Sequence, residues 1–164
     1  MRLAYADPPY LGCCARYGHD HRDPYGCWDD VATHAALVDR LARFDGWALS
    51  LTSGSLREIL PLCPDDVRVK TWCSFKTSNP AYCWEPVIFR TPFGWADRGG
   101  RSVVTVRDWH AEPVTLRQPV IGAKPPGFCR WVCHLLGVRD GDELVDLFPG
   151  TGIMGRVAAQ GVLL

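Results

Sequence analysis

The stretch that decides the fold is Glu143-Leu144-Val145-Asp146-Leu147-Phe148-Pro149-Gly150-Thr151-Gly152-Ile153-Met154-Gly155, in which an apolar run meets a glycine-rich turn. The apolar run predicts a strand over 143–148, and the residues after the turn predict a short helix over 154–160. The three glycines have the Gly-x-Gly-x-x-Gly spacing, which lets the backbone approach a cofactor where a helix begins. A tight turn without a ligand is the alternative explanation of the same glycines.

A second apolar run lies near the other end of the chain, at residues 3–6, and leads into Asp7-Pro8-Pro9-Tyr10. The two prolines fix the backbone after the acidic residue, so polar groups there are held in place in advance. A capped Pro-Pro turn with no further role is the alternative. Strands that alternate with helices between the two motifs favour an α/β fold with a largely parallel sheet.

The intervening elements follow from apolar periodicity and from turn residues. We expect helix 31–42 capped by Asp29 or Asp30, strand 47–51, a helix from Ser53 or Ser55 to residue 60, strands 67–75 and 82–89, and helix 126–136. Pro86 indicates an edge strand or a bulge, because proline cannot donate to a ladder. Residues 91–120 are expected to leave the core, with a strand-like piece at 102–106. We see no domain boundary and expect a single domain over residues 1–164.

Composition limits the class of protein. The chain has 164 residues, of which 47% are hydrophobic and 22% charged, as in one globular domain. Its 18 basic residues balance 18 acidic ones, which argues against a strongly basic nucleic-acid binder but leaves room for a local basic surface. Because no apolar run is long enough to cross a bilayer and the N-terminus has no signal-peptide pattern, we expect no membrane partner and a cytoplasmic location.

The eight cysteines are a high count for this length. They include no Cys-x-x-Cys pair, so the spacing of a zinc ribbon is absent. The alternative metal ligands are Cys129, Cys133 and His134, which can share a helix face, and His19 and His21, which lie near Cys13, Cys14 and Cys27 in the sequence. We favour reduced thiols that pack as small core side chains, and expect no metal.

Together, Asp7-Pro8-Pro9-Tyr10 and Asp146-Leu147-Phe148-Pro149-Gly150-Thr151-Gly152 resemble the catalytic and cofactor loops of S-adenosylmethionine-dependent amino-methyltransferases. Their order, with the catalytic loop first, is similar to that of the circularly permuted, β-class DNA methyltransferases. The resemblance implies a Rossmann-like fold with a mostly parallel sheet flanked by helices. It also implies S-adenosyl-L-methionine as cofactor and methyl transfer to N6 of adenine in DNA. N4 of cytosine and RNA are alternative targets, because the same acceptors serve them.

The resemblance assigns catalytic roles to Asp7, Pro8, Pro9 and Tyr10. Methyl transfer requires the lone pair of the exocyclic amine to be released from conjugation with the ring. A carboxylate at Asp7 and the carbonyl of Pro8 are suited to hold the two N–H bonds in that geometry. The prolines fix these acceptors, and Tyr10 offers an aromatic face for a flipped base. No strong base is needed, because the proton can leave after the amine becomes cationic.

Cofactor contacts are expected at Asp146, Phe148, Gly150, Gly152 and Lys124. Asp146 is assigned to the cofactor's ammonium, and Phe148 to a wall of the site. The Lys-Pro element at Lys124 resembles the one that borders the cofactor's amino-acid end; a proline-started helix is the alternative. A dinucleotide site would instead want an acid about 20 residues beyond the glycines.

Recognition of the target is expected from a short excursion at 94–120, in place of a separate target-recognition domain. Candidate contacts in that excursion and in the early loop are Arg98, Arg101, Arg107, Trp109 and His110, and Arg16, His19, His21, Arg22 and Tyr25. Solvated polar loops are the alternative. Glu85 resembles an acid near the target base, or is a salt-bridged strand residue.

Two expectations concern how the chain works with other molecules. We expect a homodimer or a partner subunit, because a short last strand at 162–164 would expose an apolar sheet edge. A catalytically silent subunit that positions nucleic acid is the alternative to an enzyme.

Overall fold

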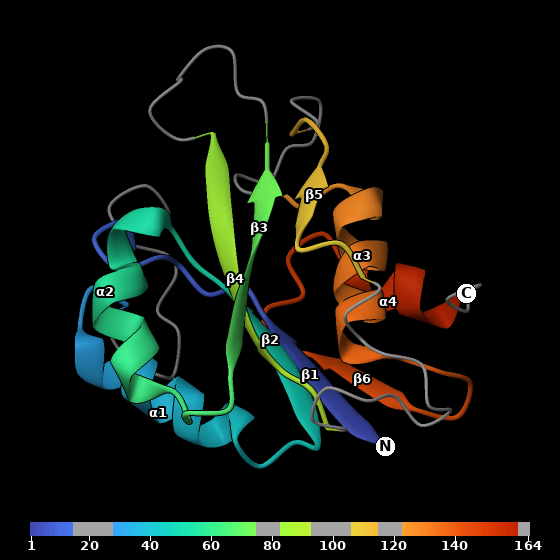
Figure 1. Cartoon of the computed structure of the whole chain (residues 1–164), viewed down its shortest axis with the longest axis horizontal. Coiled ribbons are helices and arrows are strands. Elements are labelled where there is room, and N and C mark those ends of the chain that lie inside the picture. The colour runs from blue at the N-terminus through green and yellow to red at the C-terminus, as the bar shows by residue number, and fades with distance from the viewer. Residues whose placement is uncertain (15–27, 75–82, 93–105, 115–122, 161–164) are drawn as a thin grey trace.

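The computed structural model describes residues 1–14, 28–74, 83–92, 106–114 and 123–160. One six-stranded sheet runs through them, in the order β5-β3-β4-β2-β1-β6, with helices on both faces (Figure 1). The strands are β1 (Arg2–Ala6), β2 (Gly46–Ser50), β3 (Arg68–Cys73), β4 (Trp84–Arg90), β5 (Trp109–Ala111) and β6 (Glu143–Asp146). The helices are α1 (Val31–Leu41), α2 (Leu56–Ile59), α3 (Pro126–Leu136) and α4 (Ile153–Ala159), with the 3₁₀ turns η2 (Ser53–Ser55) and η3 (Leu60–Leu62). The expected α/β class is therefore confirmed.

Strand direction determines which residues meet at one edge of the sheet. Strand β1 pairs in parallel with β2 and β6, and β3 pairs in parallel with β5. Strand β4 is antiparallel to both β2 and β3, so it is the one reversed strand of a mostly parallel sheet. The amino end of β4 consequently lies at the same edge as the carboxyl ends of the other strands.

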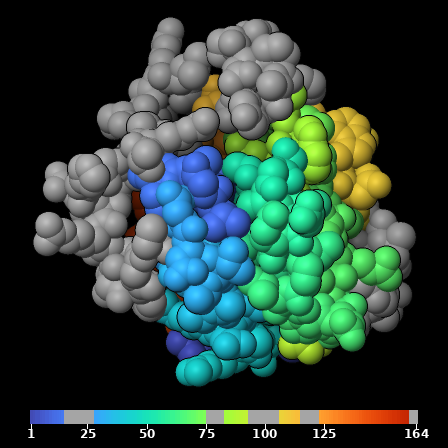
Figure 2. All heavy atoms as spheres, turned by 90° about the vertical axis from the view of Figure 1, so that its left-hand side faces the viewer, coloured from blue at the N-terminus to red at the C-terminus, as the bar shows by residue number. Residues whose placement is uncertain are grey.

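Each face of the sheet carries its own hydrophobic core. Helices α1 and α2 cover one face, where Leu37, Leu41 and Ile59 pack against alternate residues of β1 and β2. Figure 2 shows these two helices side by side on the surface of that side. Helices α3 and α4 cover the other face, where Phe128 and Leu135 are fully buried. A central strand such as β1 thus has two buried faces, which explains its continuous apolar run.

Helix α3 matches its predicted bounds because both of its ends are written in the sequence. Pro126 starts the helix, where a missing N–H costs nothing, and Gly137 ends it with a left-handed φ of 63°. Helix α1 also begins as expected, since the Asp30 carboxylate accepts from the Ala32 amide. Of the apolar residues whose helical spacing predicts this helix, Val38 and Leu41 are buried and Val31 is exposed, while His34 and Leu37 complete the buried face.

Four further predictions need correction. Thr52, rather than Ser53 or Ser55, provides the side-chain cap before α2, because its hydroxyl accepts from the Ser55 amide. Pro86 lies in the interior strand β4, not at an edge: its carbonyl faces β2 and accepts from Leu51, so its missing N–H points past the end of β2. Residues 109–111, expected to leave the core, add β5 to the sheet beside β3. Strand β6 also ends at Asp146, two residues before the predicted end.

The expected strands at 102–106 and 162–164 lie wholly or largely outside the described residues. In the part of the chain that is described, every helix is too short or too polar to cross a lipid bilayer.

Candidate functional site

The two sequence motifs meet at one edge of the sheet. Asp7 follows the last residue of β1, and Asp146 is the last residue of β6, the neighbouring parallel strand. The chain leaves β1 toward β2 on one side, while β6 flanks β1 on the other, so the strand order changes direction here. In open α/β sheets such a change creates a crevice outside the carboxyl ends of the strands, where ligands bind. The fold therefore brings both motifs to the position where a site is expected.

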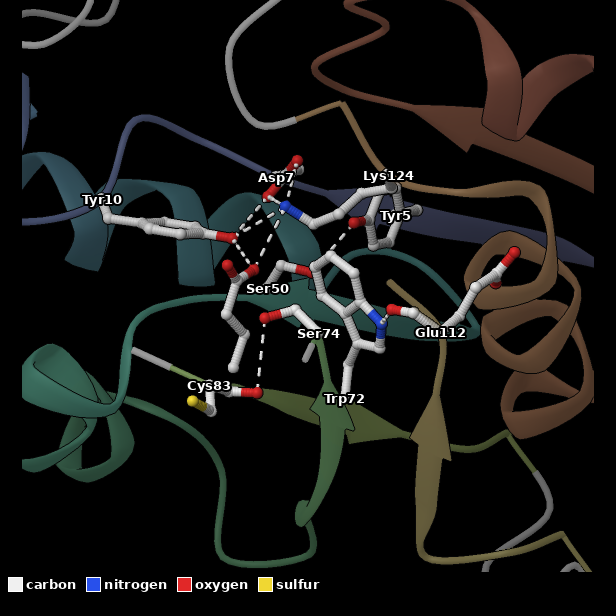
Figure 3. Close-up of polar contacts among 10 residues, drawn as sticks. Tyr5, Asp7, Tyr10, Ser50, Trp72, Ser74, Cys83, Glu112 and Lys124 are labelled. Carbon is white, nitrogen blue, oxygen red and sulfur yellow. Dashed lines mark hydrogen bonds and ion pairs between the residues drawn. The ribbon is translucent and has the colours of Figure 1, made fainter. Parts of the chain in front are cut away.

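Asp7 and Lys124 form an ion pair at this edge, although 117 residues separate them. The Lys124 Nζ lies 2.8 Å from each carboxylate oxygen of Asp7 and 2.9 Å from the Tyr10 hydroxyl oxygen (Figure 3). The Lys124 residue is 8% exposed. Its ammonium also lies 5.3 Å from the ring centroid of Tyr10 and 5.7 Å from that of Trp72. A cation is thus enclosed by oxygen acceptors and aromatic faces.

Glu85 adds a second carboxylate to this group. It lies near the start of the reversed strand β4, which is why it reaches the same edge as Asp7. Its Oε2 is 2.9 Å from the Tyr10 hydroxyl and 3.5 Å from the Lys124 Nζ. The hydroxyl of Tyr10 also lies 3.0 Å from Asp7 Oδ1. Because that hydroxyl has one proton, it donates to Asp7 or to Glu85 at any moment, and accepts from Lys124. We call Asp7, Tyr10, Glu85 and Lys124 the carboxylate–lysine cluster.

Burial controls the ionisation of this cluster. It raises the pKa of the Asp7 carboxyl above its ordinary value, and the Lys124 ammonium acts in the opposite direction. Burial also raises the pKa of Tyr10 well above its ordinary value, and the negative charges of Asp7 and Glu85 add to that increase. Tyr10 is therefore neutral at physiological pH and serves as a hydrogen-bonding group rather than as a phenolate.

Polar groups at the ends of β1, β2, β3 and β5 form hydrogen bonds around the cluster. The Tyr5 and Ser50 hydroxyls, from β1 and β2, are 2.9 Å apart beneath Asp7 (Figure 3). The indole N–H of Trp72, whose ring faces Lys124, donates to the Glu112 carbonyl at 3.0 Å. Each of these residues occupies the last positions of its strand or follows it. Serine and tyrosine at such positions are indistinguishable from ordinary strand residues, so no sequence signal predicted this support.

Glu112 connects β5 with the helix that follows Lys124. Its carboxylate accepts from the Phe128 amide in the first turn of α3 at 2.8 Å, and from His110 Nε2 at 3.0 Å. Glu112, which directly follows β5, therefore replaces the N-cap side chain of α3, because Pro125 at the cap position makes no side-chain hydrogen bond. A Cβ at Gly127 would collide with this carboxylate. Glu112 fixes the start of α3, and with it the segment that carries Lys124.

The Asp146 loop, which we define as residues 146–152, is held by fewer side-chain contacts than the carboxylate–lysine cluster. Asp146 Oδ1 accepts from the Phe148 amide at 3.1 Å, and Phe148 packs edge-on against the buried Trp28 with ring centroids 5.1 Å apart. Gly150 and Gly152 have φ values of 44° and 69°, in the left-handed region that favours glycine. Burial raises the pKa of Asp146 to about 6, and the negative charge of Asp7 contributes. Within the described ranges, no ion pair of Asp146 is found.

The predicted site residues thus lie at one edge. Lys124, expected beside the cofactor's amino-acid end, contacts Asp7 and Tyr10. Glu85, for which two explanations were open, both holds Tyr10 and approaches Lys124. Trp72 and Glu112 were missed, because their roles depend on the pairing of β3 with β5, which the sequence pattern did not reveal.

The candidate nucleic-acid residues divide into two groups. His110 stacks on Trp131 and bonds to Glu112, so it supports the fold, whereas Trp109 is 46% exposed with the Arg107 guanidinium 5.9 Å from its ring centroid. The remaining candidates lie outside the described residues: Arg16, His19, His21, Arg22, Tyr25, Arg98 and Arg101.

The cysteine-containing helix face belongs to the core. Cys129 and Cys133 are buried in α3, and burial raises the pKa of each thiol to about 12. Such thiols stay protonated at physiological pH and pack as small apolar groups. Among the side chains that the structure describes, no group of three histidine, cysteine or acidic residues is arranged to hold a metal ion.

The carboxylates of Asp7 and Glu85 are hydrogen-bond acceptors, and the carboxylate of Asp146 has the charge that would balance a cation. The chain matches no protein-family model, and a search of curated proteins found no match either.

Proposed function

We propose that this chain transfers a methyl group from S-adenosyl-L-methionine to the exocyclic N6 amine of adenine in DNA, through a Rossmann-like methyltransferase fold. The observation that carries the proposal is the position of Asp7 and Asp146 at the carboxyl ends of adjacent parallel strands, β1 and β6. Asp7 is a carboxylate acceptor suited to an amine, and it already accepts from the Lys124 ammonium. Asp146 is a carboxylate suited to a cation. A methyl-transfer site needs both, side by side.

Asp7 and the Pro8 carbonyl are the proposed acceptors for the two N–H bonds of the target amine. Acceptors held in place before the reaction favour the pyramidal nitrogen whose lone pair is free to attack. The buried Pro8 and half-buried Pro9 keep this backbone rigid. Tyr10, held by Glu85 at 2.9 Å, presents its ring beside the same acceptors. After transfer the nitrogen is cationic, and its proton leaves to Asp7 or to water.

The residues of the Asp146 loop fit a cofactor with an ammonium group. The Asp146 carboxylate has a raised pKa because it is buried without a cation in the described part of the chain, and a cationic ligand would relieve that cost. Gly150 and Gly152 leave the loop without side chains, and Phe148 provides an apolar wall. S-adenosyl-L-methionine, when bound, supplies an electrophilic methyl group on a sulfonium. The chain's own part is to orient that group toward the amine on Asp7.

A silent, nucleic-acid-positioning subunit is the second candidate. The observation that favours it is the ion pair itself: Lys124 engages both oxygens of Asp7, the acceptor that the reaction requires. In an enzyme this contact must open during each turnover, whereas in a silent subunit it can be permanent.

One experiment separates the two candidates. The purified chain is incubated with cofactor labelled in its methyl group and with mixed DNA and RNA, and the nucleosides are then analysed by mass spectrometry. Labelled N6-methyl-2′-deoxyadenosine, released from DNA, is the expected product. Label in N4-methylcytosine or in RNA would correct the target, and absence of label, with cofactor binding shown by calorimetry, would support the silent subunit. Absence of both would reject the proposal.

A further inference from the structure

We propose that Lys124 occupies, in the free protein, the position of the target amine, and that binding of the target moves Lys124 from Asp7 to Glu85. The identity of the target rests on the proposed function. The existence of a site for an ammonium group does not, because the contacts of Lys124 define it.

One amine nitrogen, the Nζ of Lys124, already occupies the acceptors of the site. The Lys124 Nζ lies 2.8 Å from both oxygens of Asp7, so it faces the open edge of the carboxylate, with the Tyr10 hydroxyl 2.9 Å away (Figure 3). Tyr10 approaches one of these oxygens, Oδ1, at 3.0 Å. An incoming amine that donates to the same edge of Asp7 would therefore overlap Lys124. The chain's own amine and an exocyclic amine compete for one position.

Lys124 has another anionic partner within reach. Glu85 Oε2 is 3.5 Å from Nζ, longer than the bonds to Asp7 but close enough to become the main contact after a small movement. The rings of Tyr10 and Trp72 lie 5.3 Å and 5.7 Å from Nζ at their centroids, and they attract a cation from either position. The displaced ammonium keeps a carboxylate and two aromatic faces, so it need not remain buried without a counter-charge.

This exchange affects how the target binds. A site that is filled by its own side chain binds a ligand with an affinity reduced by the fraction of molecules in which the site is open. Weak contacts to a wrong base would not displace an ion pair held by two oxygens. A target that also stacks on Tyr10 and donates to the Pro8 carbonyl would. Lys124 thereby makes entry to Asp7 conditional on the whole set of target contacts.

The test uses Lys124→Ala, which removes the atoms of n-propylammonium from the site. We expect n-propylammonium chloride to bind this variant, in calorimetry and as a rise in melting temperature, and n-propanol at the same concentration to have no such effect. The double variant Lys124→Ala/Asp7→Asn should lose the binding. A folded Lys124→Ala that does not respond to n-propylammonium would overturn the ammonium site.

Adenosine tests the displacement. We expect Lys124→Ala to bind adenosine about fivefold or more tightly than the native chain, and n-propylammonium to reverse the gain by competition. Lys124→Met keeps the aliphatic stem against the rings and should show the same direction, which covers the case in which the alanine variant does not fold. Equal or weaker adenosine binding by the folded variants, or no binding by any protein, would overturn the displacement. The binding experiments with n-propylammonium and adenosine contain no methyl donor, so they do not depend on methyl transfer. If the competition is observed but no methylated nucleoside forms in the labelling experiment, the proposed methyl transfer is rejected and the displacement of Lys124 stands.

Discussion

The carboxyl ends of β1 and β6 each carry an acidic residue, but the two carboxylates are in opposite situations. Asp7 is satisfied by side chains, with both oxygens on the Lys124 ammonium and one also near Tyr10. Asp146 accepts one backbone amide, its pKa is raised to about 6, and in the described segments it has no ion pair. The strands are adjacent and parallel, so position in the sheet does not explain the difference.

The difference indicates how a ligand would bind at the carboxyl ends of β1 and β6. An acceptor that already has donors is ordered, and it binds a new donor only by exchange. A partly buried carboxylate without a nearby cation has an unfavourable charge that a cationic ligand would balance, and it binds by addition. The predictions below test this contrast between exchange at Asp7 and addition at Asp146.

The largest effect is expected for Asp7→Ala. The variant should lose methyl transfer by a hundredfold or more, because an oriented contact made mainly in the transition state is worth about 3–4 kcal/mol. Cofactor affinity, measured by calorimetry, should stay near the native value, since Asp146 is unchanged. The matched control is Asp66→Asn, which breaks the exposed ion pair with Arg90 and should leave turnover unchanged. Undiminished turnover of Asp7→Ala would contradict the assignment of Asp7.

Gly152→Val is expected to abolish measurable cofactor binding while the chain stays folded. The φ of 69° at Gly152 is unfavourable for a β-branched residue by about 1–3 kcal/mol, so the loop must change shape. Calorimetry on the folded variant measures the loss. The control is Gly155→Ala in α4, where an added Cβ meets nothing within 4 Å and cofactor affinity should persist. Native affinity in Gly152→Val would mean that the loop is only a turn.

The sequence was sufficient for what depends on local pattern, and insufficient for what depends on pairing. The Pro126–Leu136 helix was predictable because proline at its start and glycine after its end are local signals. The two motifs that carry Asp7 and Asp146 were visible in the sequence, each directly after or within an apolar run, but their nearness depends on the parallel pairing of β1 with β6. The contact of Lys124 with Asp7 was not predictable, because it depends on how Glu112, directly after the unpredicted strand β5, accepts from the first turn of α3. The prediction from Pro86 was wrong because the missing N–H of a proline costs a ladder hydrogen bond only where the neighbouring strand continues beside it, and β2 ends before that point.

Asp146→Asn separates charge from hydrogen bonding at the β6 end. Asparagine can still accept from the Phe148 amide but offers no charge to the cofactor, so we expect about a tenfold to hundredfold loss of affinity at pH 7. In the native chain the affinity should fall as pH decreases through about 6, because Asp146 then becomes neutral. The variant should lack this pH dependence. A native affinity that is flat between pH 5 and 7.5 would contradict the role of the Asp146 charge.

Asp146→Asn should weaken cofactor binding but increase the stability of the cofactor-free chain. The folded pKa of Asp146, about 6, is above the ordinary value of 3.8, so between those values the folded chain binds a proton that the unfolded chain lacks. The free energy of unfolding contributed by this group is therefore lower at pH 7 than at pH 4. Because Asp146 is only partly buried and solvent screens its charge, removing the charge should stabilise the cofactor-free chain by about 1–2 kcal/mol at pH 7. Urea denaturation measures it, and a destabilised Asp146→Asn would contradict the unbalanced charge.

The smallest effect is expected where β5 meets α3. Alanine at Gly127 should by itself favour the helix by about 0.5–1 kcal/mol. Its Cβ, however, would collide with the Glu112 carboxylate that accepts from Phe128, and loss of that capping bond costs about 1–2 kcal/mol. Gly127→Ala should therefore be mildly destabilising in the native chain and stabilising in the Glu112→Ala background, where nothing remains to be displaced. Urea denaturation of the four proteins gives both signs. The same negative sign in both backgrounds would mean that Glu112 does not hold the start of α3, and that Lys124 reaches Asp7 for some other reason.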